Sequence, residues 1–376
     1  MLKNRYLTPF IQADLKKKMV FIGGPRQVGK TSIAEQVLSL PEYERGILLN
    51  WDNDSDRSAI LSREFSHDAP LIVFDEIHKN RQWRQFIKGL FDKHRKTLRI
   101  LVTGSARLDW YRFGGDSLQG RYFYHRLHPF SVAELGIETK QDFSSLLTLS
   151  GFPEPFFSGD LQEKNRWALS YRSRLVREEL RDFERVVELT KLELLAQRLP
   201  DLVGSQLSIN GLREDLQVAH ATINSWLELF ERLYYIFRIY LFGAPKLRAI
   251  KKTARVFFYD WSLVQNEGAR LENLVASHLL KWCHFKEDTE GRELELRYFR
   301  DIDQREVDFV VLERDQPSMF IEVKTEHKAS GKGLRYLKER FPSVRAIQLA
   351  LTTNEVVLTP DGIEKIPLIE FLRGLV

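Results

Sequence analysis

The stretch FIGGPRQVGKTS, residues 21–32, combines glycines with a lysine and a threonine at a spacing that suits phosphate binding. Glycines let the backbone wrap a phosphate with its amides pointing inward, and the start of a following helix adds partial positive charge. Lys30 can reach the β- and γ-phosphates, and Thr31 can offer its hydroxyl to Mg²⁺. The sequence therefore predicts a P-loop for ATP or ADP, formed by Gly24, Pro25, Arg26, Gln27, Val28, Gly29, Lys30, Thr31 and Ser32.

Two later apolar runs end in polar residues that suit the same site. LIVFDE, residues 71–76, reads as a buried strand with Asp75 at its carboxyl end, where parallel sheets bind ligands. Asp75 is expected to hold Mg²⁺, and Glu76 to polarise the attacking water. The next run, RILVTGS, ends in Thr103 and Ser105, which either hydrogen-bond the γ-phosphate or the water or simply form a turn.

A second set of charged side chains, near the C-terminus, suits metal-dependent phosphodiester hydrolysis. Glu322 and Lys324 lie two apart in FIEVKTEHKASG, so on a strand they project from the same face. Asp308 is the expected acidic partner from the preceding strand, with Glu306 as an alternative. Glu272 comes from the helix before it. Clustered carboxylates of this kind hold Mg²⁺ or Mn²⁺, and the lysine lies near the attacking water.

A third set suits contact with DNA. Residues 209–239 read as helix, short turn and helix, which predicts a helix-turn-helix with His220, Thr222, Asn224 and Ser225 at the start of its second helix. A basic ribbon follows, with no acidic residue between Pro245 and Val256. Such cations can neutralise phosphates, although a solvated hairpin or a protein-binding wing would look the same. The ribbon comprises Lys246, Arg248, Lys251, Lys252 and Arg255.

Length, charge and cysteine content limit what kind of protein carries these three groups of residues. The chain has 376 residues, 43% hydrophobic and 29% charged, with a formal net charge of +5. This length predicts several domains, and the mild positive charge permits a polyanionic partner. Cys283 is the single cysteine, so no intramolecular disulfide forms, and no signal peptide or membrane span is recognisable. A cytoplasmic location without membrane contact is expected.

The elements that must position these residues divide the chain into four expected domains. Apolar runs alternate with helical stretches from Met19 to about Leu135, which predicts an α/β layer with parallel strands. We expect an ATPase core at 1–140, a helical lid at 141–190, a winged helix at 191–265 and an α/β C-terminal domain at 266–376.

The motifs together resemble AAA+-type ATPases of bacteria and archaea. The stretches that carry the resemblance are GGPRQVGKTS, IVFDEIHK, LVTGSAR, LQGRYFYHRLHPFSVAEL and GFPEPF. The resemblance implies a P-loop core, a helical lid, a winged helix and a restriction-endonuclease-like domain. In ring-forming ATPases an arginine before the strand that begins at Tyr122 enters the neighbouring subunit's site. This implies self-association and makes Arg121 the candidate finger, with Arg126 and Arg112 as rivals.

The C-terminal set resembles the PD-(D/E)XK nuclease superfamily and is similar to archaeal Holliday-junction resolvases. The matching residues are Glu272, Asp308, Glu322 and Lys324, while Val307 precedes Asp308 in place of a proline that the superfamily often lacks. The resemblance implies a nuclease-like fold, but a fold does not guarantee activity.

Three functions follow from these expectations. The first is an ATP-hydrolysing protein that binds and remodels branched or structured DNA and cleaves it with a metal. The second is a nucleotide-dependent switch whose C-terminal modules bind proteins. The third is a DNA-binding ATPase with an inactive nuclease domain.

Overall fold

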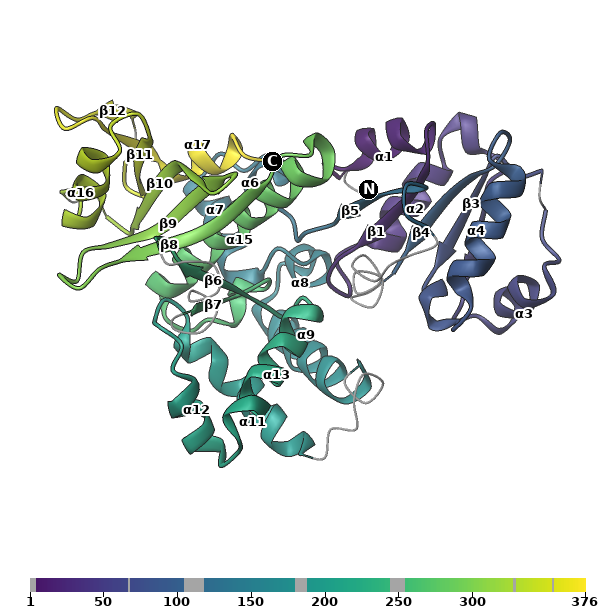
Figure 1. Cartoon of the computed structure of the whole chain (residues 1–376), viewed down its shortest axis with the longest axis horizontal. Helices are drawn as coiled ribbons and strands as arrows, with labels where there is room; N and C mark the ends of the chain where they lie inside the picture. Colours follow the sequence, from purple (N-terminus) through teal and green to yellow (C-terminus); the bar gives the residue numbers. More distant parts are fainter. Residues whose placement is uncertain are drawn as a thin grey trace. The chain divides into compact units, whose positions relative to one another are not determined.

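The computed structural model describes residues 5–66, 68–104, 118–179, 188–243, 254–326, 329–353 and 355–376 (Figure 1). The chain divides into two compact units. The first comprises residues 1–128 with 232–234, and the second comprises 129–231 with 235–376. The first unit therefore ends at His128, before the expected core boundary at residue 140.

The first unit is built on a five-stranded sheet with the order β2-β3-β4-β1-β5, and every pairing in it is parallel. This confirms the predicted parallel α/β layer. Its strands are β1 (Met19–Gly23), β2 (Ile47–Asn50), β3 (Leu71–Asp75), β4 (Arg99–Thr103) and β5 (Tyr122–Arg126). Its helices are α1 (Thr8–Leu15), α2 (Lys30–Leu38), α3 (Asp54–Ser62) and α4 (Trp83–His94), with short 3₁₀ turns η1 (Pro41–Tyr43) and η2 (Ile77–Lys79).

Alternation along the strands gives this sheet two different faces. On one face, residues such as Ile72 and Phe74 of β3 pack with Trp83 and Ile87 of α4 in one apolar cluster. The opposite face is covered by α2, which contacts β3 and β4. Because side chains alternate along a strand, Asp75 lies on the face opposite to Phe74. The polar end of β3 therefore faces the helix that begins at the P-loop lysine.

The second unit begins with helices. These are α6 (Val132–Leu135), α7 (Lys140–Leu149), α8 (Pro153–Ser158), α9 (Leu161–Arg174), α11 (Leu189–Arg198), α12 (Ile209–Leu216) and α13 (His220–Arg232). A π-helical turn, η4 (Leu175–Glu179), extends α9, and 3₁₀ turns η5 (Leu199–Leu202) and η6 (Trp261–Leu263) lie further along. In α13 the apolar residues of one face, among them Trp226 and Phe230, are buried.

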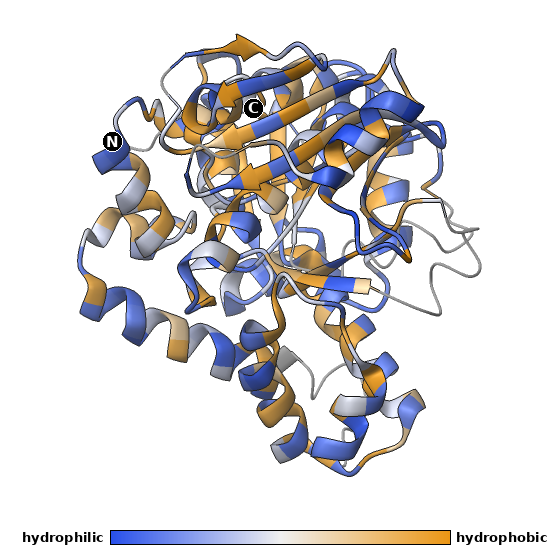
Figure 2. Ribbon diagram, turned by 90° about the vertical axis from the view of Figure 1, so that its left-hand side faces the viewer, coloured by the Kyte–Doolittle hydropathy of each residue, from blue (hydrophilic) through white to orange (hydrophobic). Residues whose placement is uncertain are grey.

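An eight-stranded mixed sheet forms the rest of the second unit, in the order β12-β13-β11-β10-β9-β8-β6-β7. Apolar and hydrophilic residues alternate along both the strands and the helices (Figure 2). The strands are β6 (Ile236–Leu241), β7 (Ala254–Phe258), β8 (Leu294–Arg300), β9 (Glu306–Glu313), β10 (Gln316–Lys324), β11 (Arg345–Ala350), β12 (Val357–Leu358) and β13 (Ile363–Pro367). The remaining helices are α15 (Glu267–Glu290), α16 (Lys332–Arg340) and α17 (Leu368–Arg373).

The long helix α15 begins and ends at residues suited to those positions. The side chain of Asn266 accepts a hydrogen bond from the Ala269 amide at 3.0 Å, and Gly291 ends the helix with a φ of 68°.

Among the described residues, no helix has both the length and the apolar content needed to cross a membrane.

The β6–β7 hairpin is continuous with the C-terminal sheet. Tyr240 and Leu241 of β6 pair in parallel with Arg297 and Tyr298 of β8. The boundary expected between residues 265 and 266 therefore separates strands that belong to one sheet. A sequence cannot reveal this pairing, because it joins segments more than fifty residues apart.

Candidate functional site

The P-loop leaves β1 through a backbone that glycine makes possible. Gly24 has a φ of 143°, and a Cβ added there would lie 2.3 Å from the Leu127 carbonyl oxygen. Gln27 and Gly29 also have positive φ values, 58° and 99°. Such left-handed residues turn successive amides inward and form an anion-binding concavity just before α2.

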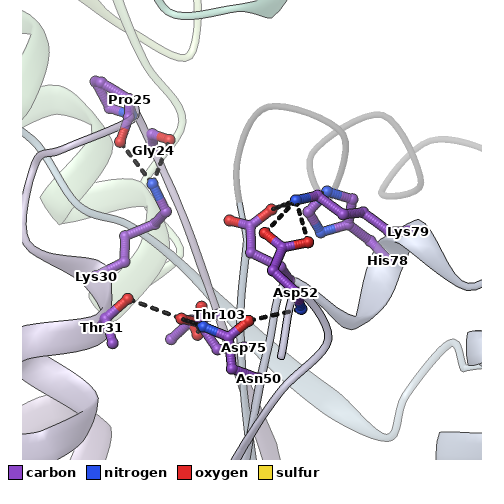
Figure 3. Close-up of polar contacts among 11 residues, drawn as sticks. Gly24, Pro25, Lys30, Thr31, Asn50, Asp52, Asp75, His78, Lys79 and Thr103 are labelled. Atoms are coloured by element: carbon purple, nitrogen blue, oxygen red, sulfur yellow. Dashed lines mark hydrogen bonds and ion pairs between the residues drawn. The ribbon is translucent and has the colours of Figure 1, made fainter. Parts of the chain in front are cut away.

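Lys30 is the first residue of α2, and its side chain is folded into this loop (Figure 3). Its Nζ donates to the carbonyl oxygens of Gly24 at 3.1 Å and Pro25 at 2.6 Å. Burial lowers the pKa of Lys30 from 10.5 to about 8. A buried ammonium group held by loop carbonyls fits the phosphate chain of a nucleotide.

Asp75 connects the P-loop helix to the strand ends. Its Oδ2 accepts from the Thr31 hydroxyl at 2.9 Å, and its Oδ1 accepts from the Thr103 hydroxyl at 2.6 Å. The Asn50 amide nitrogen lies 3.3 Å from Asp75 Oδ2, as Figure 3 shows. Burial raises the pKa of Asp75. Oxygen ligands from Thr31 and Asp75, close to an anion-binding loop, suit Mg²⁺.

Glu76 begins a neighbouring charged group. It adopts a left-handed backbone with φ 56° and ψ 20°, and its amide donates to the Thr103 carbonyl at 2.9 Å. Its Oε2 lies 3.5 Å from His78 Nε2 and 3.7 Å from Lys79 Nζ. Lys79 also bonds Asp52, at 2.7 Å from Oδ1. A strained backbone of this kind costs about 1–3 kcal/mol and is often found at functional sites.

Sequence reasoning missed three residues near this site: Asn50, Asp52 and Lys79. Asn50 ends β2 directly beside Asp75, so the ends of adjacent apolar runs were the signal that could have found it. Asp52 and Lys79 carry no local signature, because their ion pair joins loops far apart in the sequence.

Other predicted nucleotide residues have mixed outcomes. Thr103 joins the Asp75 network, whereas Ser105 and Arg112 lie outside the described residues. Arg121 pairs with Asp92 of α4 at 2.9 Å, so its role as a finger stays a prediction.

At the C-terminal set, Glu322 and Lys324 do lie together. Lys324 Nζ is 3.0 Å from Glu322 Oε1, and the Gly331 amide donates to Glu322 Oε2 at 2.9 Å. On β9, Asp308 accepts from the Val323 amide at 2.7 Å. The predicted pairing of these two strands is confirmed by their antiparallel register.

Arg255 corrects the prediction that it belongs to an exposed DNA-binding ribbon. Its side chain is 1% exposed, 3.5 Å from Glu272 Oε1, and bonded to Glu306. Its guanidinium lies over the Tyr298 ring, 4.6 Å from the centroid. The packing of β7 against α15 explains the difference, because Arg255 reaches Glu272 of α15 and Glu306 of β9.

The predicted metal site does not fit this arrangement. Within the described ranges, no three Asp, Glu, His or Cys side chains gather closely enough to hold a metal ion. Arg255 already supplies a cation beside Glu272 and Glu306. Burial, followed by repulsion from Asp308, raises the pKa of Glu272 to about 8, and burial raises that of Asp308 to about 6. A carboxyl that keeps its proton near neutral pH, as Glu272 does, is a poor metal ligand.

The helix-turn-helix residues lie where the sequence placed them. Helix α13 begins at His220, and Thr222, Asn224 and Ser225 are half-buried in its first turns. The Asn224 amide nitrogen lies 3.0 Å from His220 Nδ1. The ribbon cations Lys246, Arg248, Lys251 and Lys252 lie outside the described residues.

Three parts of the chain match known families, and one of these families has a described domain type. Residues 16–136 match the family described as an AAA domain. Residues 140–271 and 267–371 match two families that are each described as a domain of unknown function, DUF8612 and DUF4143. The N-terminal part is thus similar to AAA domains, and the other two matches assign no activity.

Individual relatives are distant. An uncharacterized protein of Methanocaldococcus jannaschii, MJ1637, is 20% identical over 340 residues, which cover 74% of this chain and 70% of that protein. The Orc1 protein of Aeropyrum pernix in complex with DNA aligns with 12% identity and a TM-score of 0.37, covering 74% of this chain and 94% of that chain. A variant of Thermotoga maritima RuvB aligns with 15% identity and a TM-score of 0.28, covering 62% and 88%.

Proposed function

We propose that this protein hydrolyses ATP and uses the energy to bind and remodel DNA. The observation that carries the ATPase part is the set of Lys30, Thr31, Asp75 and Thr103, joined at the P-loop and the strand ends. Lys30 binds the phosphates, Thr31 and Asp75 hold Mg²⁺, and Glu76 orients the attacking water. Mg²⁺ held by Thr31 and Asp75 would neutralise negative charge on the phosphates.

The DNA part of the proposal is supported by the sequence of the second unit. The start of α13 offers His220 and Asn224, and the stretch between Pro245 and Val256 contains only basic charges. Helices α11–α13 with the β6–β7 hairpin then act as a winged helix. We further propose that the DNA is branched and that the protein self-associates. In such an oligomer Arg121 would act as a finger in the neighbouring subunit's ATP site.

ATPase rates measured with linear, forked and four-way DNA across a salt series test this proposal. We expect DNA to raise turnover, with the largest effect from branched DNA, and the effect to weaken as salt screens the phosphates. Turnover that ignores DNA of every shape would exclude the motor and favour a nucleotide-dependent switch that binds proteins.

A second candidate, a DNA-binding ATPase that does not cut, is favoured by the position of Arg255. Its contacts with Glu272 and Glu306 give these carboxylates a counter-ion within the protein. Incubation of a labelled four-way junction with Mg²⁺ or Mn²⁺ separates the candidates. If the wild type cleaves the junction and Glu322→Ala and Lys324→Ala do not, the domain is a nuclease. If the wild type gives no cleavage products, the domain binds DNA without cutting it.

A further inference from the structure

The buried side chain of Arg5 contacts the P-loop from outside the motif. Its Nη1 donates to the Val28 carbonyl oxygen at 2.7 Å, and its Nη2 donates to the carbonyl oxygen of His128. Arg5 is 4% exposed, so both bonds form away from water. Hydrogen bonds from a charged donor in such surroundings are stronger than bonds between neutral groups.

The contact with Val28 fixes the orientation of a whole peptide group. In a trans peptide the carbonyl and the following amide point in opposite directions, and no cis peptide occurs among the described residues. If Arg5 holds the Val28 carbonyl on one side, the Gly29 amide must face the other side. Gln27 and Gly29, the residues on either side of Val28, both have positive φ, so the loop at this peptide is neither ordinary helix nor extended backbone.

The other contact of Arg5 reaches the segment where the chain leaves the first unit. This exit segment, residues 126–128, is also tied to the end of β1, just before the P-loop, by the Leu127 amide, which donates to the Gly23 carbonyl at 2.8 Å. Tyr6 holds it from the outer side, because its hydroxyl donates to the Arg126 carbonyl at 2.7 Å and accepts from the His128 amide at 3.3 Å. Arg5 thus contacts both the P-loop and the exit segment.

We propose that Arg5 is a positioning residue for nucleotide binding: it turns the Gly29 amide toward the phosphates and ties that orientation to the exit segment. This inference rests on the proposed nucleotide site and adds a residue that no P-loop motif contains. Arg5 touches neither nucleotide nor metal. It acts through the Val28–Gly29 peptide, so its loss weakens binding of the phosphates.

Equilibrium binding of ADP and ATP to the full chain tests the proposal. Arg5→Met keeps an unbranched side chain but removes the donors, and we expect the Kd for both nucleotides to rise about tenfold to a hundredfold. The kcat at saturating ATP should change much less than the KM, since bound phosphate itself orients the amide. Arg5→Lys, which keeps one charged donor group, should recover part of the affinity.

Two further variants locate the cause. Tyr6→Phe loosens the exit segment without touching Val28, so it should bind ADP within about twofold of the wild type. Lys30→Ala should lose binding, which establishes that the site itself is the nucleotide site. With that established, a folded Arg5→Met that binds ADP as the wild type does, or an equal loss in Tyr6→Phe, overturns the role of Arg5 alone. If Arg5→Met does not fold, the comparison of Arg5→Lys with Tyr6→Phe decides: a loss only in Arg5→Lys supports the role.

The change in hydrogen exchange on binding ADP distinguishes a positioning role of Arg5 from a purely structural one. In the wild type, ADP should slow exchange of the amides in residues 126–128, because the ordered P-loop fixes Arg5 and thereby the His128 carbonyl. In Arg5→Lys this ADP-dependent protection should be reduced even at saturating ADP. Equal protection in both proteins would contradict the tie to the exit segment.

Discussion

At the scale of single residues, the charge of Lys30 should control nucleotide affinity near neutral pH. Burial lowers its pKa to about 8, so the amine is mostly charged at pH 7 and mostly neutral at pH 9. The Kd for ADP should therefore rise about tenfold between these two pH values, as the charged fraction falls. The rise will be smaller if bound phosphate raises the lysine pKa. Titrations of ADP from pH 6.5 to 9.5 measure this directly.

In the absence of nucleotide, the free energy of unfolding should rise with pH above about pH 8, whereas the affinity for ADP falls. The unfolded lysine keeps its proton up to about pH 10.5, whereas the folded one loses it above about pH 8. The unfolded state therefore binds more protons between these values, and this group makes the free energy of unfolding rise with pH there. Lys30→Met removes both effects, and a pH-dependent ADP affinity that survives in Lys30→Met would rule out Lys30 as the titrating group.

The expected role of Glu76 in orienting the attacking water can be tested separately from ATP binding. Its carboxylate lies beside His78 and Lys79 rather than within the Asp75 network. Glu76→Gln should lower ATP turnover by about a hundredfold or more while leaving the Kd for ATP within about threefold. Single-turnover kinetics and equilibrium binding measure the two quantities. Undiminished turnover would remove Glu76 as the group that orients water.

At the scale of elements, Arg255 should stabilise the packing of β7, β9 and α15 in a pH-dependent way. Burial raises the pKa values of Glu272 and Asp308, so the folded state binds more protons than the unfolded state between about pH 4 and 8. Stability of the second unit should therefore fall as pH rises through this window. Arg255→Met should cost about 3–5 kcal/mol at pH 8, where the carboxylates lose their counter-ion, and less at pH 5.

Urea titrations of the full chain, followed by hydrogen exchange in β8 and β9, measure this cost. Arg345→Met is the matched control in the same sheet. Arg345 is half exposed and pairs with Glu364 at 2.7 Å, so its loss should cost about 0–1 kcal/mol at either pH. An Arg255→Met cost that does not change with pH would mean that the carboxyls near Arg255 do not titrate.

The same elements show what the sequence could and could not predict. Lys30 and Asp75 were found because a P-loop and the end of an apolar strand are local patterns, and the parallel sheet then brings them together. Arg255 was misplaced because its surroundings come from β9 and α15, far along the chain, and a basic stretch looks alike whether its arginine faces water or carboxylates. Arg5 had no signal at all, because its acceptors are backbone carbonyls.

At the scale of the whole molecule, DNA affinity should depend on the ribbon cations other than Arg255. Each phosphate contact adds about 0.9 to the slope of log K against log salt. Replacing Lys246, Arg248, Lys251 and Lys252 by alanine should therefore lower that slope by up to about 3–4, since four cations are lost. Arg255→Met should leave the slope unchanged, because a side chain that is 1% exposed has no access to phosphate.

A second control separates the ribbon from net charge. Lys16 and Lys17 are exposed cations of the first unit, so Lys16→Ala with Lys17→Ala removes charge without changing the ribbon. Fluorescence anisotropy with a labelled forked DNA, from 50 to about 300 mM salt, gives the slope for each protein. If the ribbon variant and this control lower the slope by the same amount per charge, DNA senses only the overall field, and the winged-helix part of the proposal fails. A loss confined to the ribbon would place the DNA on the second unit and leave the first unit to supply the hydrolysis.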